Sequence, residues 1–335
     1  MRKLHLLFMF LFISAYGYSQ TLHSSAKILK LMSASKLSFN VIPFDKPVVS
    51  KDYSDRVNIN YVYRVLTPSG FEPHQFIPNK NAQSSFDKSE AFFKDGNIVS
   101  AMLWYKMTLS LDSSLFHVIT YIGQLYEKKN DYDNAILWYK KAISKNYIDY
   151  MAHWFLADAY MTRNDTKNAV DEIVIARILN RNHPRIKESM SRIFDKDKRN
   201  KEDWNFNPQV NITKISDTKI NISFDQSWSG YAMAKALWTY EPGYRESMGV
   251  PKGKYSIVED FECLTTMVLE QDIEKTKSDN DPQLSILQKV AYTEKLPEYI
   301  LYEIVLPQTP NVVYQLSEET ILKIKDYVLN KRNTK

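Results

Sequence analysis

Residues with reactive side chains are few in this chain of 335 residues. The single cysteine, Cys263, lies beside Leu264 and Met267 in a predicted helix, and apolar neighbours raise the pKa of a thiol and make it inert. One cysteine excludes an intramolecular disulfide and any metal site that needs two thiolates. All six histidines lie within the first 183 residues, outside the C-terminal part that holds the thiol. A pairing of Cys263 with His117 or His153 stays open, but we expect a structural cysteine.

The spacings that bind metals or activate nucleophiles are also missing. Neither His117 nor His153 has a second histidine four residues away, so no His-Glu-x-x-His zinc motif forms. Ser-x-x-Lys pairs begin at Ser24, Ser33 and Ser85, but a lysine-rich chain produces them by chance and the companion motifs are absent. With only 8 glycines, no phosphate-binding loop motif occurs. We therefore expect no catalytic residue, no metal and no cofactor.

The elements that would position any site are organised by a repeat of 34 residues. Ala101, Ala135 and Ala169 recur at this interval, and the tetrapeptide Leu-Trp-Tyr-Lys at 103–106 returns at 137–140. In the middle of the chain, apolar residues spaced by three and four predict paired helices on either side of a turn at Asn130. One pair cannot bury its apolar stripe alone, so neighbouring pairs must stack on it.

These residues resemble the tetratricopeptide repeat family. The family pattern W-x2-L-G-x2-Y, followed by A and then F or Y, is matched at Ile119, Ile122, Gly123, Tyr126, Ala135 and Tyr139. The resemblance implies three stacked helical pairs, at residues 82–115, 116–149 and 150–183. The first pair departs from the pattern, with Ser89 in place of Gly, and the usual closing Pro is absent from all three.

The whole chain is predicted to be mainly α and to have five parts. Residues 1–19 form a signal peptide and 20–81 an extended leader that prolines interrupt. The three-repeat α-solenoid occupies 82–183, and a capping helix with its linker occupies 184–203. Residues 204–335 are predicted to form a mostly helical α+β domain that begins with a β-hairpin.

The N-terminal sequence predicts export. Arg2 and Lys3 precede an apolar run of about a dozen residues, which is too short to span a bilayer, and we expect cleavage after Ser19. The leader resembles those of exported Bacteroidetes proteins, so a periplasmic or secreted protein is expected. A formal charge of +5 before cleavage is too small to favour nucleic acid, and we expect no membrane insertion after cleavage.

The resemblance also implies where a partner binds, because the first helix of each repeat lines the concave face of such an array. The expected inward residues are Phe86, Glu90, Phe93, Lys94, His117, Thr120, Gln124, Lys128, Met151, Trp154, Asp158 and Met161. The Lys/Arg/Asn set with which family members hold chaperone tails is absent. Aromatic and methionine side chains on a wall favour contact with a peptide or protein.

The sequence therefore predicts a non-catalytic, exported scaffold that binds a partner peptide or protein on the concave face of its repeats. Three alternatives stay open. The chain's own leader or C-terminal domain covers that face, or the C-terminal domain is an uncharacterised hydrolase for which the repeats act as an adaptor. The third is a glycan-binding surface built from Trp204, Trp228, Trp238 and Tyr244.

Overall fold

The computed structural model describes residues 22–58, 61–201, 204–251, 256–273, 281–291 and 293–333. The predicted signal peptide, residues 1–19, lies outside the described residues. Two units make up the chain, and each joins two separate stretches. The sheet unit consists of Met1–Lys51 and Trp204–Ile300, and the repeat unit consists of Asp52–Asp203 and Leu301–Lys335.

These units differ from the linear division expected from the sequence. The stretch 20–81 is not one leader, because its beginning belongs to the sheet unit and the rest to the repeat unit. The expected C-terminal domain, 204–335, is likewise divided after Ile300. The physical reason is that short strands and helices bury their apolar faces against partners distant in sequence, which local patterns do not reveal.

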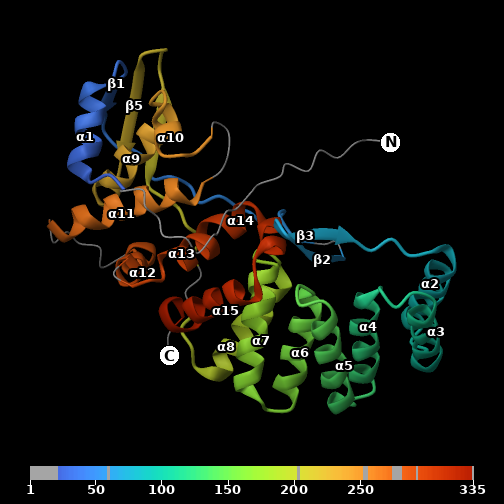
Figure 1. Ribbon diagram of the computed structural model, residues 1–335. Coiled ribbons are helices and arrows are strands. Elements are labelled where there is room, and N and C mark those ends of the chain that lie inside the picture. The colour runs from blue at the N-terminus through green and yellow to red at the C-terminus, as the bar shows by residue number, and fades with distance from the viewer. Residues whose placement is uncertain are drawn as a thin grey trace. The chain divides into compact units, whose positions relative to one another are not determined.

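The repeat unit contains the three predicted helical pairs, which lie side by side in Figure 1. Their helices are α2 (Lys80–Lys94), α3 (Ile98–Leu111), α4 (Phe116–Lys128), α5 (Tyr132–Lys145), α6 (Tyr150–Thr162) and α7 (Thr166–Leu179). A further helix, α8 (Pro184–Asp197), packs on α7 with Pro184 at its first turn. The predicted mainly α fold with a three-repeat array is confirmed.

The 34-residue period has a direct structural cause. Ala101, Ala135 and Ala169 are fully buried, because a small side chain there lets paired helices approach closely. The turns between paired helices place Gly96, Asn130 and Asn164 in the left-handed backbone region, at φ values of 74°, 58° and 59°. Glycine and asparagine tolerate this conformation best, which explains why these residue types repeat at that position.

Gly123 on α4 is required by its neighbour on α5. A Cβ atom at this position would lie 2.5 Å from Cε1 of Tyr139, well inside van der Waals contact. The Tyr139 ring is fully buried, and its hydroxyl donates a hydrogen bond to Glu127 over 2.6 Å. The ring therefore fills the space that glycine leaves between the two helices.

Segments from outside the repeats complete this unit. Strands β2 (Val62–Thr67) and β3 (Gly70–Gln75) form an antiparallel hairpin that pairs Val62 with Gln75. At the other end of the chain follow η2 (Ile300–Val305), α14 (Leu306–Gln308), η3 (Pro310–Gln315), α15 (Glu318–Tyr327) and η4 (Val328–Arg332). Helix α15 packs on α7, where Lys325 forms an ion pair of 3.1 Å with Asp171.

The sheet unit contains the predicted hairpin, β4 (Val210–Lys214) and β5 (Lys219–Phe224). Strand β1 (Ser38–Val41) pairs with β5 in parallel, and the strand order is β1-β5-β4. Its helices are α1 (Ser25–Ala34), η1 (Gln226–Trp228), α9 (Ser229–Tyr240), α10 (Tyr244–Ser247), α11 (Ile257–Ile273), α12 (Pro282–Ala291) and α13 (Leu296–Tyr299). Ile220 and Ile222 of β5 pack against Ala232 and Ala236 of α9 to form the core.

Within the described part of the chain, none of the helices combines the length and the apolar character needed to cross a membrane.

Candidate functional site

The first helices of the three repeats form a hollow that is open to solvent. This open hollow has about 410 Å³ of space, and nine residues line it: Phe93, Gln124, Glu127, Lys128, Tyr132, Trp154, Phe155, Asp158 and Arg185. Five of them, Phe93, Gln124, Lys128, Trp154 and Asp158, were expected on the inner face from the sequence. The structure thus brings together residues from α2, α4 and α6, which lie one repeat apart.

Aromatic rings and cations form the wall of the open hollow. The Trp154 indole lies nearly parallel to the Phe155 ring, with 5.2 Å between their centres, and Cζ of Arg185 lies 5.2 Å from the indole centre. Across the hollow, Nζ of Lys128 lies 5.1 Å from the centre of the Phe93 ring. Such cation–π pairs hold long basic side chains against apolar surface, so their charged groups stay at the mouth of the hollow.

Trp154 is fixed rather than free to turn. It is only 7% exposed, and its indole N–H donates a hydrogen bond of 2.9 Å to the hydroxyl of Ser189 on α8. Because its edge is bonded to the protein and little of its surface is exposed, the indole is a fixed part of the wall of the open hollow. Sequence reasoning did not identify Ser189, Phe155 or Arg185, because helix α8 and the far side of α6 were not counted as part of the inner face.

Two carboxylates give the open hollow a mixed charge. Asp158 accepts a hydrogen bond of 2.6 Å from Arg192, yet burial raises the pKa of Asp158 above its usual range. Burial likewise raises the pKa of Glu127, against the lowering effect of its hydrogen bond from Tyr139. The lining of the open hollow therefore combines aromatic rings with both cations and carboxylates.

The other end of the inner face is covered by the chain itself. Residues 56–58 and 61–79, hereafter the covering segment, lie against the repeats. The Tyr61 ring stacks on His117 with 4.3 Å between ring centres, and Phe76 lies 5.1 Å from the same imidazole. His117 is 8% exposed, and burial lowers its pKa to about 4. The expectation that His117 faces a partner is therefore corrected, because the protein's own Tyr61 and Phe76 rings pack against it, whereas the half-buried Phe86 lines a further space of about 330 Å³ beside these rings.

Asparagine side chains of the repeats hold the backbone of the covering segment. Asn146 donates from Nδ2 to the carbonyl oxygen of Val62 over 2.9 Å. Asn180 accepts from the backbone N–H of Asn58 over 3.0 Å and donates to its carbonyl oxygen over 2.8 Å. Asn146 and Asn180 cap the C-terminal ends of helices α5 and α7 and are 34 residues apart. The recurrence of asparagine at the repeat interval was therefore visible in the sequence, but its role was not predicted.

The remaining expected residues do not line the open hollow. Met151 borders a cavity of about 20 Å³, roughly the size of a water molecule, beside Tyr61 and Asp149. Glu90 accepts a hydrogen bond from the hydroxyl of Tyr105. Thr120 is buried and donates to Asp149. Lys94 is exposed in the last turn of α2 and Met161 is half-buried on α6.

The reactive side chains that the sequence offered, Cys263 and His153, are held by structural contacts. Cys263 is fully buried, and burial raises the pKa of its thiol well above the usual value. Both ring nitrogens of His153 are within hydrogen-bond distance of a partner, Glu172 at 2.6 Å and the carbonyl oxygen of Tyr147 at 2.9 Å. No group of three or more metal-ligating side chains is found in the parts of the chain that the structure describes. The glycan alternative loses its surface, since Trp228, Trp238 and Tyr244 are buried.

A buried polar cluster lies in the sheet unit, where the hydrolase alternative would need its carboxylates. Glu262 accepts hydrogen bonds from the indole of Trp238 at 2.7 Å, the hydroxyl of Tyr244 at 2.6 Å and the backbone N–H of His23 at 2.8 Å. The nearby Glu259 forms ion pairs with Lys235 and Arg245. The expectation that no histidine reaches this part is wrong for His23, because the N-terminal stretch folds into the sheet unit. These bonds give both carboxylates a structural role.

The comparisons with known proteins agree with the repeat pattern. The family model described as Tetratricopeptide repeat matches residues 121–144, within α4 and α5. This match falls on the middle helical pair, where the residues at 119–139 resemble the same family. No curated protein sequence matches the chain.

The solved structures that the chain is similar to include tetratricopeptide repeat proteins. One is the first such domain of Spaghetti (RPAP3) bound to an HSP90 peptide, with TM-score 0.35 and 16% identity, covering 36% of this chain and 99% of that one. Another is the chaperone SycD of Yersinia enterocolitica with a YopD peptide, with TM-score 0.33 and 15% identity, covering 36% and 96%. A repeat protein of Parabacteroides merdae, with TM-score 0.33 and 12% identity, covers 72% of this chain and 83% of its own.

Proposed function

We propose that this protein is a non-catalytic interaction scaffold that binds an extended segment of another protein in the open hollow. The observation that carries the proposal is that the same array already holds an extended stretch of its own chain. Asn146 and Asn180 bind backbone groups of the covering segment, and His117 packs against its aromatic rings. The open hollow continues the inner face with the same kinds of side chain and has no described segment among its lining residues.

The chemistry of the open hollow defines the partner. Phe93 and Phe155, which are half-buried, offer apolar surface to an aromatic or aliphatic side chain, and a buried aromatic contact of this kind supplies most of the affinity at many interfaces. Lys128 and Arg185 at the mouth favour a carboxylate on the partner, while Gln124 provides an amide for its backbone. The expected ligand is thus a short, extended peptide with an apolar anchor and an acidic residue nearby.

Selection from a peptide library tests this function. Peptides selected on the full-length protein are measured by fluorescence anisotropy against two variants of the open hollow, Phe93→Ala and Arg185→Glu. Each is expected to weaken binding by roughly tenfold or more, as removal of an interface anchor does. Leu137→Ala is the matched control, because Leu137 is 63% exposed on α5 and does not line the open hollow. Equal affinity in all three variants contradicts the proposal.

We also propose that the protein is exported and acts in the periplasm or outside the cell. The support is the sequence of residues 1–19, with its basic start and apolar run. The test is N-terminal sequencing of the protein recovered from cell fractions. A chain that begins after Ser19 in the envelope or medium is the expected result, and an intact N-terminus on protein found inside the cell contradicts it.

A further inference from the structure

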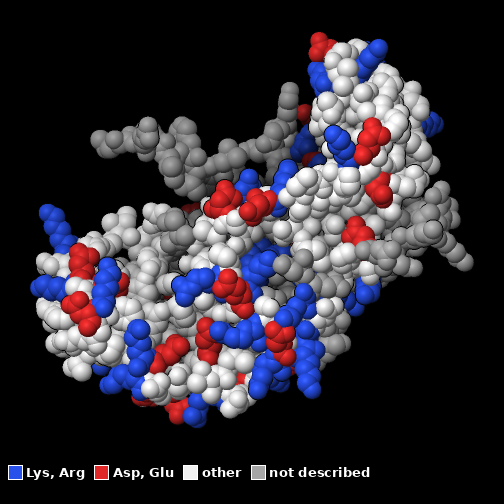
Figure 2. Space-filling view, turned by 180° about the vertical axis from the view of Figure 1, so that it is seen from behind, with Lys and Arg blue, Asp and Glu red and all other residues white. Residues whose placement is uncertain are grey.

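A second pocket of the repeat unit, away from the open hollow, is lined by basic side chains. This basic pocket has about 100 Å³ of space, and its lining includes five cationic residues: Arg177, Arg181, Lys187, Lys201 and Arg332. They come from α7, the turn after it, α8, the chain beyond α8 and the C-terminal η4. No carboxylate is among the described residues that line the pocket. Figure 2 shows Lys and Arg side chains interspersed with Asp and Glu side chains on one face of the molecule.

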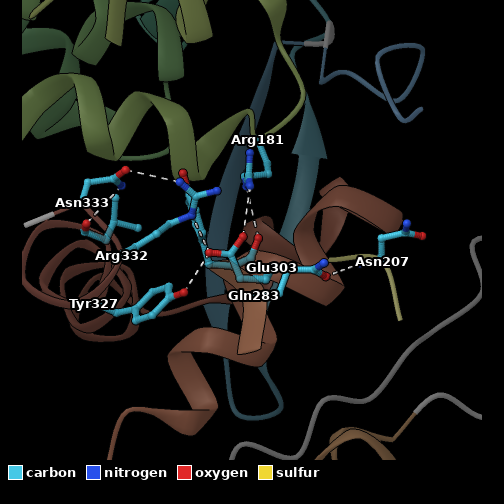
Figure 3. A network of polar contacts seen from close by, with 9 residues as sticks. Arg181, Asn207, Gln283, Glu303, Tyr327, Arg332 and Asn333 are labelled. Atoms are coloured by element: carbon cyan, nitrogen blue, oxygen red, sulfur yellow. Dashed lines mark hydrogen bonds and ion pairs between the residues drawn. The ribbon is translucent and has the colours of Figure 1, made fainter. Parts of the chain in front are cut away.

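The buried carboxylate of Glu303 orients two of the arginines that line the basic pocket. Glu303 forms ion pairs with Nε of Arg332 at 2.7 Å and with Nη2 of Arg181 at 3.3 Å, and the hydroxyl of Tyr327 donates to it over 2.8 Å. Figure 3 shows these three side chains converging on Glu303. Burial alone would lower the pKa of Arg332, but Glu303 raises it above its usual value, so this guanidinium stays charged. The arginines are therefore held in fixed positions before any ligand arrives.

An aromatic ring fixes the same two guanidinium groups a second time. Cζ of Arg181 lies 4.2 Å and Cζ of Arg332 5.7 Å from the centre of the Tyr302 ring. Arg181 also donates from Nε to the backbone carbonyl of Tyr302 over 3.1 Å. Its Nη1 makes no hydrogen bond to any residue in the described ranges and belongs to a side chain that lines the basic pocket. A planar guanidinium held in this way suits an anion that has several oxygens.

The volume of the basic pocket and its neutral hydrogen-bond donors indicate which class of anion the pocket binds. A space of about 100 Å³ is large enough for a single tetrahedral oxyanion. The hydroxyl of Ser191 and the amide of Asn333 add neutral donors to the lining. We propose that the basic pocket binds a phosphate-class oxyanion, either free or as the phosphoryl group of a small molecule or lipid.

Calorimetric titration of the full-length protein with inorganic phosphate tests this site. We expect saturable binding of phosphate and no comparable binding of acetate. The double variant Lys187→Gln/Lys201→Gln, which changes two exposed lining residues, should weaken phosphate binding by roughly tenfold, because two charge-assisted contacts are lost. The control Lys145→Gln/Lys167→Gln removes the same charge from exposed positions that do not line the pocket and should bind like the wild type.

The result that overturns the proposal is equal phosphate affinity in both double variants, or acetate binding as tight as phosphate. Vesicles with and without phosphatidic acid distinguish the source of the phosphoryl group. Binding to phosphatidic acid vesicles that Lys187→Gln/Lys201→Gln abolishes assigns a lipid headgroup, and binding of soluble phosphate alone assigns a free anion. Neither probe is the peptide of the open hollow, so this site and the proposed function fail independently.

Discussion

The side-chain amide of Asn180 binds the backbone of Asn58 at both its N–H and its carbonyl oxygen, over 3.0 and 2.8 Å. Asn58 in turn donates from its own amide to the carbonyl oxygen of Leu179 over 2.9 Å. Asn180 binds the backbone of Asn58 and not its side chain. The same contact is therefore compatible with extended chains of many different sequences. It fastens the covering segment to the C-terminal end of α7 in the last repeat.

Asn180→Ala is expected to loosen the covering segment. The substitution leaves both backbone groups of Asn58 buried without the partner that now satisfies them, which costs about 2 to 3 kcal/mol of unfolding free energy. Urea unfolding measures the loss, and hydrogen exchange should quicken at the Asn58 amide. Asn330→Ala removes an exposed asparagine that bonds only to Asp326 at 2.6 Å, and it should change stability by less than about 0.5 kcal/mol. Equal losses of unfolding free energy in the two variants argue against a role of Asn180 in holding the covering segment.

Gly123→Ala is expected to destabilise the middle repeat by about 1 to 3 kcal/mol, the usual cost of overpacking. The new methyl group would collide with Tyr139, which is buried and hydrogen-bonded to Glu127 and so has little room to move. The third repeat shows a compatible pair at the equivalent positions, Ala157 with Ile173, both fully buried.

A double-mutant cycle in which Tyr139→Ile is combined with Gly123→Ala separates this collision from other effects. The double variant should lose about 1 kcal/mol less than the sum of the single losses, because the smaller side chain makes room for the methyl group. Additive losses would show that the close approach of Gly123 and Tyr139 is not the reason for glycine.

Stability is expected to fall with pH because of His117. Its pKa is lowered by burial from 6.5 to about 4, so the unfolded chain binds the proton more readily than the folded protein. The contribution of His117 to the unfolding free energy is therefore fully present above pH 6.5, and it is lost as the pH falls from 6.5 toward 4. At pH 5 the loss from this group amounts to about 2 kcal/mol relative to pH 8. Unfolding free energies at the two pH values for wild type and His117→Phe measure it, and an unchanged difference in the variant contradicts the assignment.

Glu262→Gln is expected to destabilise the sheet unit by about 3 kcal/mol. The carboxylate accepts three hydrogen bonds from Trp238, Tyr244 and the His23 backbone, and an amide nitrogen at either oxygen position would face donors instead. Urea unfolding followed by circular dichroism measures the loss. Glu246→Gln, at an exposed position of α10, is the control and should stay within about 0.5 kcal/mol of the wild type. Similar midpoints for the two variants would remove the structural role given to Glu262.

The helical repeats could be predicted from the sequence because their determinants are local and recur. Ala135 marks the close helix approach, Asn130 the left-handed turn and Gly123 the space for Tyr139, and each acts within one 34-residue unit. Helices α9, α11, α12 and α15 lie within residues 204–335, which were predicted to be mostly helical, since caps and apolar spacing act over a few residues. Five residues of the open hollow followed from the resemblance to the tetratricopeptide repeat family.

Only the tertiary structure decided which part of the inner face is covered and which is open. The pairing of Asn58 with Asn180 joins residues 122 positions apart, and that of His23 with Glu262 joins residues 239 apart. Strand β1 likewise pairs with β5, which is distant from it in the sequence. No local pattern encodes such contacts, because their free energy arises only when distant segments exclude water from each other. The repeats were therefore determined by local sequence, and their free binding surface by the way the rest of the chain folds onto them.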